Sequence, residues 1–177
     1  SLAYKLVHGA TTHGIQFADP PMADQPTSYY HEESGVGLAL RFFPRQTGRR
    51  IGVVGLGVGT LAAYAQRGDR FRFYEINPEI KRLAETRFTY LRRSEARVEV
   101  VIGDARLSLE GEPPQEFDLL VLDAFSGDAI PVHLLTEEAF ALYLHHLKAD
   151  GVIAVHLSNR CLNLLPVIKG VVGRLRL

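Results

Sequence analysis

Apolar runs recur along the chain, separated by amphipathic segments, which predicts strands that alternate with helices. The run Phe117–Leu122 is nearly continuous, as expected for a strand that is buried on both faces. The predicted strands are Ile51–Val54, Phe71–Tyr74, Val98–Ile102, Phe117–Leu122 and Gly151–Leu157. The predicted helices among them are Thr60–Gln66, Pro78–Phe88, Glu137–Leu147 and Leu162–Leu175. This order indicates an α/β fold with a doubly wound, mainly parallel Rossmann-like sheet.

The first 34 residues follow a different pattern. They are rich in Gly, Pro, Thr, His and Tyr and show weak periodicity, so we expect residues 1–34 to form an N-terminal arm or small β segment. Gly35–Phe43 predicts a short helix that leads into the core. Residues 35–177 then form one nucleotide-binding domain, because a chain of 177 residues is too short for two comfortable domains.

The composition narrows the classes of function. Apolar residues make up 46% and charged residues 23% of the chain, which is typical of globular domains. Twenty basic residues balance twenty acidic ones, so the chain lacks the basic excess of a nucleic-acid-binding protein. The single cysteine, Cys161, excludes an internal disulfide, and no apolar run approaches the roughly 20 residues that span a bilayer. We therefore expect a soluble, cytoplasmic protein.

Three glycines, Gly55, Gly57 and Gly59, follow the first predicted strand at alternate positions. Glycine lets the backbone turn sharply and approach a ligand without interference from a Cβ atom. Ligands of a parallel sheet collect at the carboxyl ends of its strands, where the next helix presents free amide groups. The segment predicts a nucleotide-binding turn, although a tight strand-to-helix turn without a ligand has the same pattern.

Acidic residues at the next two strand ends bear on the identity of the nucleotide. Glu75 lies about twenty residues beyond Gly55, which is the spacing of a carboxylate that holds ribose hydroxyls. A dinucleotide-binding turn needs glycine at its sixth position, where this chain has Thr60. Asp104, followed by Ala105, ends the third strand and suits the amine of adenine. These residues favour an adenosyl sulfonium, either S-adenosylmethionine or its decarboxylated form.

Two carboxylates follow the fourth predicted strand. Asp123 stands where the strand leaves the sheet, and Asp128 lies in the loop after it. Paired carboxylates beside a nucleotide can bind an amine, orient it and take up its proton. The structural alternative is that Asp123 caps the loop and that Asp128 is solvated.

Other polar residues carry weaker signals. The seven histidines show no zinc-type spacing, so we predict no metal site. His156 and Ser158 follow the fifth strand without the nucleophile elbow of a hydrolase. Tyr29 and Tyr30 are neighbours, and we expect that they do not both point inward.

Taken together, these strand ends resemble those of the spermidine synthase family of aminopropyltransferases, which has the class I methyltransferase fold. The stretch from His13 to Gln16 is similar to the family's N-terminal substrate-contacting segment, and Tyr29-Tyr30-His31-Glu32 is similar to its Tyr-(Gln/His)-Glu segment. The resemblance implies catalytic Asp123, nucleotide-binding Gly55, Gly57, Gly59, Glu75, Asp104 and Ala105, and amine-binding Gln16, Tyr30 and His31. Asp128 is a further candidate for binding the amine, because of its place in the loop after the fourth strand.

The chain departs from that family at three places. The family's glycine loop usually carries an aspartate that binds the ammonium end of the aminopropyl donor, and Val58 stands there. The family's fourth loop usually carries a second aspartate, and Ser126 stands there. Two further C-terminal strands of the fold are expected, and no sequence for them follows Leu177.

Three functions stay open at this point. The first is aminopropyl transfer to a polyamine-type amine, with Asp123 as base or orienter. The second is methyl transfer from S-adenosylmethionine, whose carboxylate does not require an aspartate in place of Val58. The third is a non-catalytic binding module, such as the soluble part of a transporter fusion. The expected partner is a small-molecule amine rather than nucleic acid or a membrane, and a homodimer stays open.

Overall fold

The computed structural model describes residues 2–9, 11–43, 48–124, 130–157 and 164–175. Within these ranges the strands are β1 (Ala3–His8), β2 (Thr11–Phe17), β3 (Arg50–Val54), β4 (Arg70–Glu75), β5 (Arg97–Ile102), β6 (Phe117–Leu122) and β7 (Leu147–Val155). The helices are α1 (Gly35–Phe42), α2 (Pro78–Arg87), α3 (Tyr90–Arg93), α4 (Ala105–Glu110), α5 (Glu137–His145) and α6 (Leu165–Leu175). Three short 3₁₀ helices are η1 (Ser28–Tyr30), η2 (Thr60–Tyr64) and η3 (Val132–Leu134).

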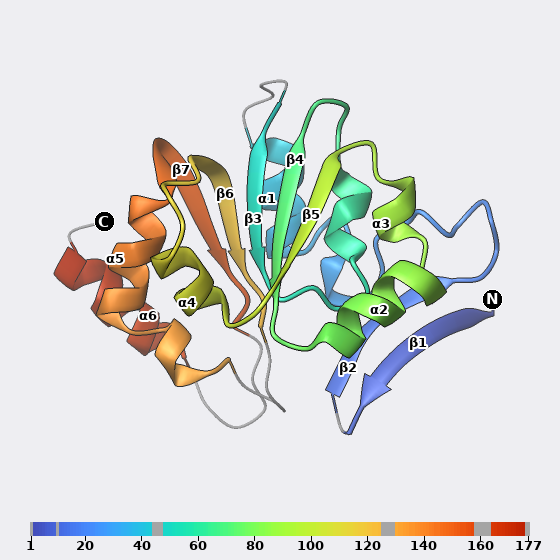
Figure 1. Cartoon of the computed structure of the whole chain (residues 1–177), viewed down its shortest axis with the longest axis horizontal. Coiled ribbons are helices and arrows are strands. Elements are labelled where there is room, and N and C mark those ends of the chain that lie inside the picture. Colours follow the sequence, from blue (N-terminus) through green and yellow to red (C-terminus); the bar gives the residue numbers. More distant parts are fainter. Residues whose placement is uncertain (1, 10, 44–47, 125–129, 158–163, 176–177) are drawn as a thin grey trace.

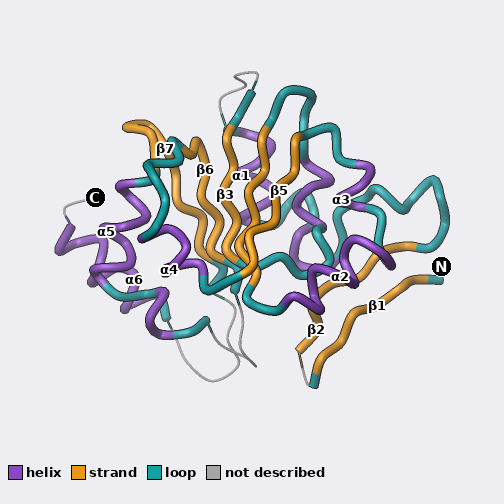
Figure 2. Tube along the Cα trace, viewed as in Figure 1, coloured by secondary structure: helices purple, strands orange, loops and turns teal. Residues whose placement is uncertain are grey.

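Strands β3 to β7 form one parallel sheet in the order β5-β4-β3-β6-β7 (Figure 1). Helices α4, α5 and α6 cover one face, and α1, α2 and α3 lie on the other side (Figure 2). The chain winds outward from β3 to β5 and then returns to β6, so the two halves of the sheet diverge between β3 and β6. The predicted doubly wound, parallel α/β fold is confirmed. Such a divergence point is where ligands of this architecture bind.

Two apolar layers enclose the sheet, because successive side chains of a strand point to opposite faces. On β6, Leu120 and Leu122 pack in the layer that contains Tyr143 of α5. Leu119 and Val121 of the same strand pack in the opposite layer, with α1 and η2. All six side chains of β6 are buried, which explains its continuous apolar pattern and its central place in the sheet.

Side-chain caps set where the helices begin. Asn77 accepts a hydrogen bond from the backbone N–H of Glu79 at 2.9 Å, and Pro78 follows at the first helical position, as the sequence predicts. The glycine turn continues differently, since the predicted helix Thr60–Gln66 is the shorter 3₁₀ helix η2. It ends where Ala65 adopts an extended conformation. A 3₁₀ helix this short has only a small dipole, so η2 adds little positive potential at the glycine turn.

The predicted N-terminal arm contains an antiparallel hairpin, β1 and β2 (Figure 1). Val58 of the glycine turn has no exposed surface and packs in a cluster with Phe88 and Tyr90. Gly14 of β2 makes room for it, because a Cβ atom on Gly14 would lie 2.4 Å from a methyl carbon of Val58. The Val58 side chain thus anchors the hairpin to the glycine turn.

Replacing Val58 by aspartate should detach this anchor. We expect Val58→Asp to lower the free energy of unfolding by about 3 kcal/mol or more, because apolar contacts are lost and a carboxylate is buried without a partner. Urea unfolding measures the change. Val132→Asp is the matched control at a valine that is 80% exposed, and its effect should stay below about 0.5 kcal/mol. Equal effects of the two substitutions would contradict the anchoring role.

Candidate functional site

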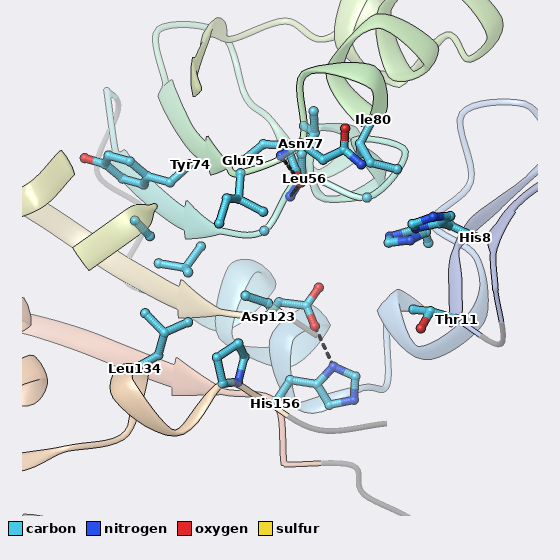
Figure 3. A pocket seen from close by; sticks show the side chains of 18 of the residues that line it. His8, Thr11, Leu56, Tyr74, Glu75, Asn77, Ile80, Asp123, Leu134 and His156 are labelled. Atoms are coloured by element: carbon cyan, nitrogen blue, oxygen red, sulfur yellow. Dashed lines mark hydrogen bonds and ion pairs between the residues drawn. The ribbon is translucent and has the colours of Figure 1, made fainter. Parts of the chain in front are cut away.

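A cavity of about 880 Å³ lies at the carboxyl ends of the central strands, with the hairpin forming part of its wall. Figure 3 shows Glu75 and Asp123 on different sides of this space, with His8 and Thr11 of the hairpin facing it. The cavity therefore occupies the edge of the sheet where the predicted site residues are expected.

The glycine turn forms one wall and needs its glycines for close packing. Gly55 has a φ of 99°, and a Cβ atom on it would lie 2.5 Å from the carbonyl oxygen of Asp123. Gly57 has a φ of 55°, and a Cβ atom there would lie 2.4 Å from the carbonyl oxygen of His13. Both residues line the cavity, whereas Gly59 is not among the residues that line it.

Glu75, at the end of β4, is buried in the cavity wall beside the glycine turn. One of its oxygens accepts a hydrogen bond from the N–H of Leu56 at 3.1 Å, and the other accepts one from the N–H of Asn77 at 2.8 Å. Burial raises the pKa of Glu75, and these backbone donors oppose the shift. An ionised carboxylate offers about four lone-pair sites, so acceptor capacity remains for hydroxyl groups of a ligand.

Asp104 and Ala105 also line the cavity, beyond β5. Oδ1 of Asp104 accepts a hydrogen bond from the N–H of Leu107 at 3.0 Å and so caps α4, a helix absent from the predicted elements. Oδ2 lies 2.9 Å from Nε2 of His133. Burial works to raise the pKa of Asp104, but the hydrogen bonds from Leu107 and His133 outweigh it and the pKa is lowered. Both carboxylate oxygens of Asp104 therefore have partners within the protein, and the residue also lines the cavity.

Asp123 directly follows β6, and its side chain is only 4% exposed. Oδ2 accepts a hydrogen bond from the hydroxyl of Tyr30, and Oδ1 lies 2.6 Å from Nδ1 of His156. Tyr30 comes from η1 and His156 follows β7, so three distant segments of the chain meet here. A buried carboxylate needs such partners, because burial of an unpaired charge is costly.

Two tyrosines pack beside this carboxylate. Tyr29 and Tyr30 both line the cavity, so the expectation that they do not both point inward is wrong. Their ring centroids are 4.4 Å apart, and the ring of Tyr29 is 4.8 Å from that of His156. Burial, reinforced by the charge of Asp123, raises the pKa of Tyr29 and raises that of Tyr30 well above its ordinary value. Tyr30 therefore keeps its proton and donates a hydrogen bond to Asp123.

Two of the predicted amine-binding residues, Gln16 and His31, do not line the cavity. Gln16 is buried, and its amide donates to the carbonyl of Ala23 and the hydroxyl of Thr89 and accepts from the N–H of Thr89. These bonds tie the hairpin to the segment before α3. His31 is exposed, and neither it nor Gln16 lines the cavity. Asp128 lies outside the described residues.

Some cavity residues are not assigned by the sequence patterns. The hairpin contributes His8 and Thr11, and His156 follows the end of β7. His13, in the stretch that resembles the family's substrate-contacting segment, also lines the cavity. Nε2 of His13 is buried and has no hydrogen-bond partner among the described residues, and burial together with His8 lowers the pKa of His13. The signal for His156 is its place just beyond the strand next to β6. The predicted strand Gly151–Leu157 includes His156, because it extends two residues past Val155, where β7 ends.

The described part of the chain offers neither a cluster of metal-binding side chains nor a membrane-spanning helix. No group of three or more His, Cys, Asp or Glu side chains is arranged to hold a metal ion in that part of the chain. No helix in the same part has the length and apolar character needed to cross a membrane.

Comparisons with known proteins agree with this architecture, although no protein-family model matches the chain. A polyamine aminopropyltransferase of Vibrio vulnificus (strain CMCP6) is 30% identical over 161 residues, which cover 88% of this chain and 51% of that protein. An N-terminal histidine N-methyltransferase of Emericella nidulans is 35% identical over 109 residues, which cover 60% of this chain and 19% of that protein. The solved structure of human methyltransferase-like protein 13 in complex with SAH matches with a TM-score of 0.68 at 22% identity, covering 84% of this chain and 73% of that one.

The chain has a spermidine synthase-like fold of the class I methyltransferase type. It spans about half the length of the aminopropyltransferase and about a fifth of the histidine methyltransferase. In this spermidine synthase-like fold the cavity at the strand ends brings together Gly55, Gly57, Glu75, Asp104, Ala105, Tyr30 and Asp123 from the predicted site.

The bond from Tyr30 to Asp123 should be visible in the pH dependence of stability. The folded protein keeps the Tyr30 proton that an unfolded tyrosine loses above about pH 10, so Tyr30 makes the free energy of unfolding fall as the pH rises past that value. In Tyr30→Phe the fall should be shallower by up to ~1.4 kcal/mol per pH unit. At pH 7 the variant should be less stable by about 1.5–3 kcal/mol, because a charged acceptor loses its donor. Urea unfolding from pH 7 to 11 measures both effects, and an unchanged slope would contradict this role of Tyr30.

Proposed function

We propose that this spermidine synthase-like chain is the nucleotide-binding part of a transferase that moves an aminopropyl group from an adenosyl sulfonium to a polyamine-type amine. The observation that carries the proposal is Asp123, which is held by Tyr30 and His156 in the same cavity as Glu75. The similarity to a polyamine aminopropyltransferase over 88% of the chain supports this reaction class.

The adenosine end of the nucleotide is assigned to the wall made by β3, β4 and β5. Gly55 and Gly57 line the cavity beside Glu75, whose remaining lone pairs suit the ribose hydroxyls. Ile80 and Leu134 also line the cavity and suit the apolar faces of adenine, with Asp104 nearby for its amine. The sulfonium then lies toward Asp123, on the other side of the cavity.

Transfer requires a neutral amine to attack the carbon next to the sulfonium sulfur. Alkylamines enter as ammonium ions, so a group in the site must accept a proton before the attack. Carboxylates also bind ammonium groups through strong charge-assisted hydrogen bonds. Asp123 is placed to act as the base or to orient the base, and the proposed amine site lies beside it.

Methyl transfer from S-adenosylmethionine is the second candidate. The observation that favours it is Val58, which is buried beneath the hairpin and supplies no carboxylate for the ammonium end of a decarboxylated donor. The similarity to a histidine N-methyltransferase over 60% of the chain also supports it.

The remaining parts of the proposal follow from the same cavity. The arm, residues 1–34, and the nucleotide-binding domain, residues 35–177, act together, because the hairpin lines the cavity with the strand ends. The partner is a small-molecule amine rather than nucleic acid, in line with the equal numbers of basic and acidic residues. A cytoplasmic location is part of this proposal.

Calorimetry with S-adenosylmethionine and its decarboxylated form tests the nucleotide site. The proposal expects tighter binding of the decarboxylated form, whereas tighter binding of the intact form would favour methyl transfer. Glu75→Gln should weaken binding by about tenfold or more, because a donor amide replaces an acceptor of the ribose hydroxyls. Glu79→Gln is the matched control at an exposed carboxylate of α2 and should leave the affinity unchanged. If neither nucleotide binds, both candidates fail.

A mass-spectrometric assay with the decarboxylated nucleotide and putrescine tests the transfer itself. Asp123→Asn should lower the rate ~100-fold or more, whether Asp123 accepts the proton or orients the group that does. Turnover that is unchanged in this variant would remove Asp123 from the mechanism.

A further inference from the structure

Asp123 and His156 are the first residues beyond two neighbouring parallel strands, β6 and β7. Leu122 pairs with Val155 in the sheet register, and the N–H of His156 donates to the carbonyl oxygen of Leu122 at 3.0 Å. The backbone therefore fixes the two side chains next to each other. Figure 3 shows them joined by their hydrogen bond in the cavity wall.

This hydrogen bond determines which nitrogen of the imidazole carries a proton. An ionised carboxylate only accepts hydrogen bonds, so Nδ1 of His156 must donate to Oδ1 of Asp123 across their 2.6 Å separation. Nε2 of the neutral ring then carries the lone pair and is the atom that can take up a proton. The ring of Tyr29 packs against the imidazole, and Tyr30 holds the other oxygen of Asp123, so both side chains are restrained.

The two side chains both line the cavity but differ in solvent exposure. The side chain of His156 is 22% exposed, whereas that of Asp123 is 4% exposed. His156 is the more exposed member of the pair. Imidazole side chains in general exchange protons near neutral pH. The carboxylate lies between two donors, where it stabilises an imidazolium, as the carboxylate of a hydrolase triad does. The titratable groups described beside His156 are Asp123 and Tyr29, with Tyr30 beyond the carboxylate.

We propose that His156 accepts the proton of the incoming amine and that Asp123 is its positioning residue, an inference that rests on the proposed transferase function. The acceptor's ammonium gives one proton to Nε2 of His156, and the resulting imidazolium pairs with Asp123. The neutral amine attacks the carbon next to the sulfonium; the N–C bond forms, and the C–S bond breaks with its electron pair left on sulfur. The products are a neutral thioether and a secondary ammonium, and His156 later releases its proton to water.

The test uses His156→Gln and His156→Ala in the transfer assay with the decarboxylated nucleotide and putrescine. Glutamine can still donate to Asp123 but cannot take up a proton, so kcat should fall ~100-fold or more while KM changes less than about threefold. Added imidazole should restore activity to His156→Ala, because it supplies the missing base. His145→Gln makes the same change at an exposed histidine at the end of α5 and should keep the wild-type kcat.

Two further measurements separate a proton acceptor from a packing residue. The pH profile of kcat/KM should show an ionisation in the wild type that is missing in His156→Gln. Nitrogen-15 spectra of the histidines should show His156 with its proton on Nδ1, a result that does not depend on turnover. A proton on Nε2 of the neutral ring would overturn the inference.

The outcomes distinguish this inference from the proposed function. If the wild type transfers the aminopropyl group and His156→Gln keeps kcat within about threefold, the inference fails and the proton acceptor is sought at Asp123. The inference also fails if imidazole restores no activity to His156→Ala and the pH profile of His156→Gln keeps the wild-type ionisation. A wild-type protein that binds the nucleotide but transfers nothing defeats the proposed function, and the inference falls with it.

Discussion

A row of backbone hydrogen bonds along the carboxyl edge of the sheet determines where the polar groups of the cavity lie. Each bond extends a parallel ladder by one residue beyond a strand end. They run from the N–H of Gly103 to Glu75, Gly55 to Tyr74, Asp123 to Val54 and His156 to Leu122, with lengths of 2.8–3.0 Å. The residues that leave the sheet are therefore held as firmly as the strands themselves. A site built in this way keeps its geometry without depending on the longer loops.

The position of Asp123 links the N-terminal arm to the carboxyl edge of the sheet. A Cβ atom on Gly55 would lie 2.5 Å from the carbonyl oxygen of Asp123, so the glycine turn packs directly on the end of β6. The carboxylate of Asp123 is buried by this packing and needs donors. One donor, Tyr30, comes from the arm, and the arm in turn is anchored where Gly14 contacts Val58. The buried charge and the docking of the arm thus stabilise each other.

The sequence predicts the sheet well, because local apolar runs are enough to mark strands and a parallel sheet brings their carboxyl ends together. The polar residues at those ends, Glu75 and Asp123, could be placed at the cavity for this reason. The role of His156 could not be read in the same way, since it depends on the register of β7 against β6 rather than on any local pattern. Gln16 lies away from the cavity because its amide is used in long-range bonds to Thr89, which no spacing rule contains.

Val58 shows why a residue that breaks a family pattern needs a structure to interpret it. Its side chain points into the cluster with Phe88 and Tyr90, so the substitution fits the packing of the hairpin. In the proposed binding mode the tail of the nucleotide would meet the hairpin wall, where burial lowers the pKa of His13 and so favours its neutral ring. A neutral acceptor holds an ammonium less tightly than a carboxylate does, since charge-assisted hydrogen bonds are roughly twice as strong as neutral ones. An aminopropyl donor bound here would gain less from its ammonium end, so a larger share of its binding energy would fall on the contacts of its adenosine end with Glu75 and the glycine turn.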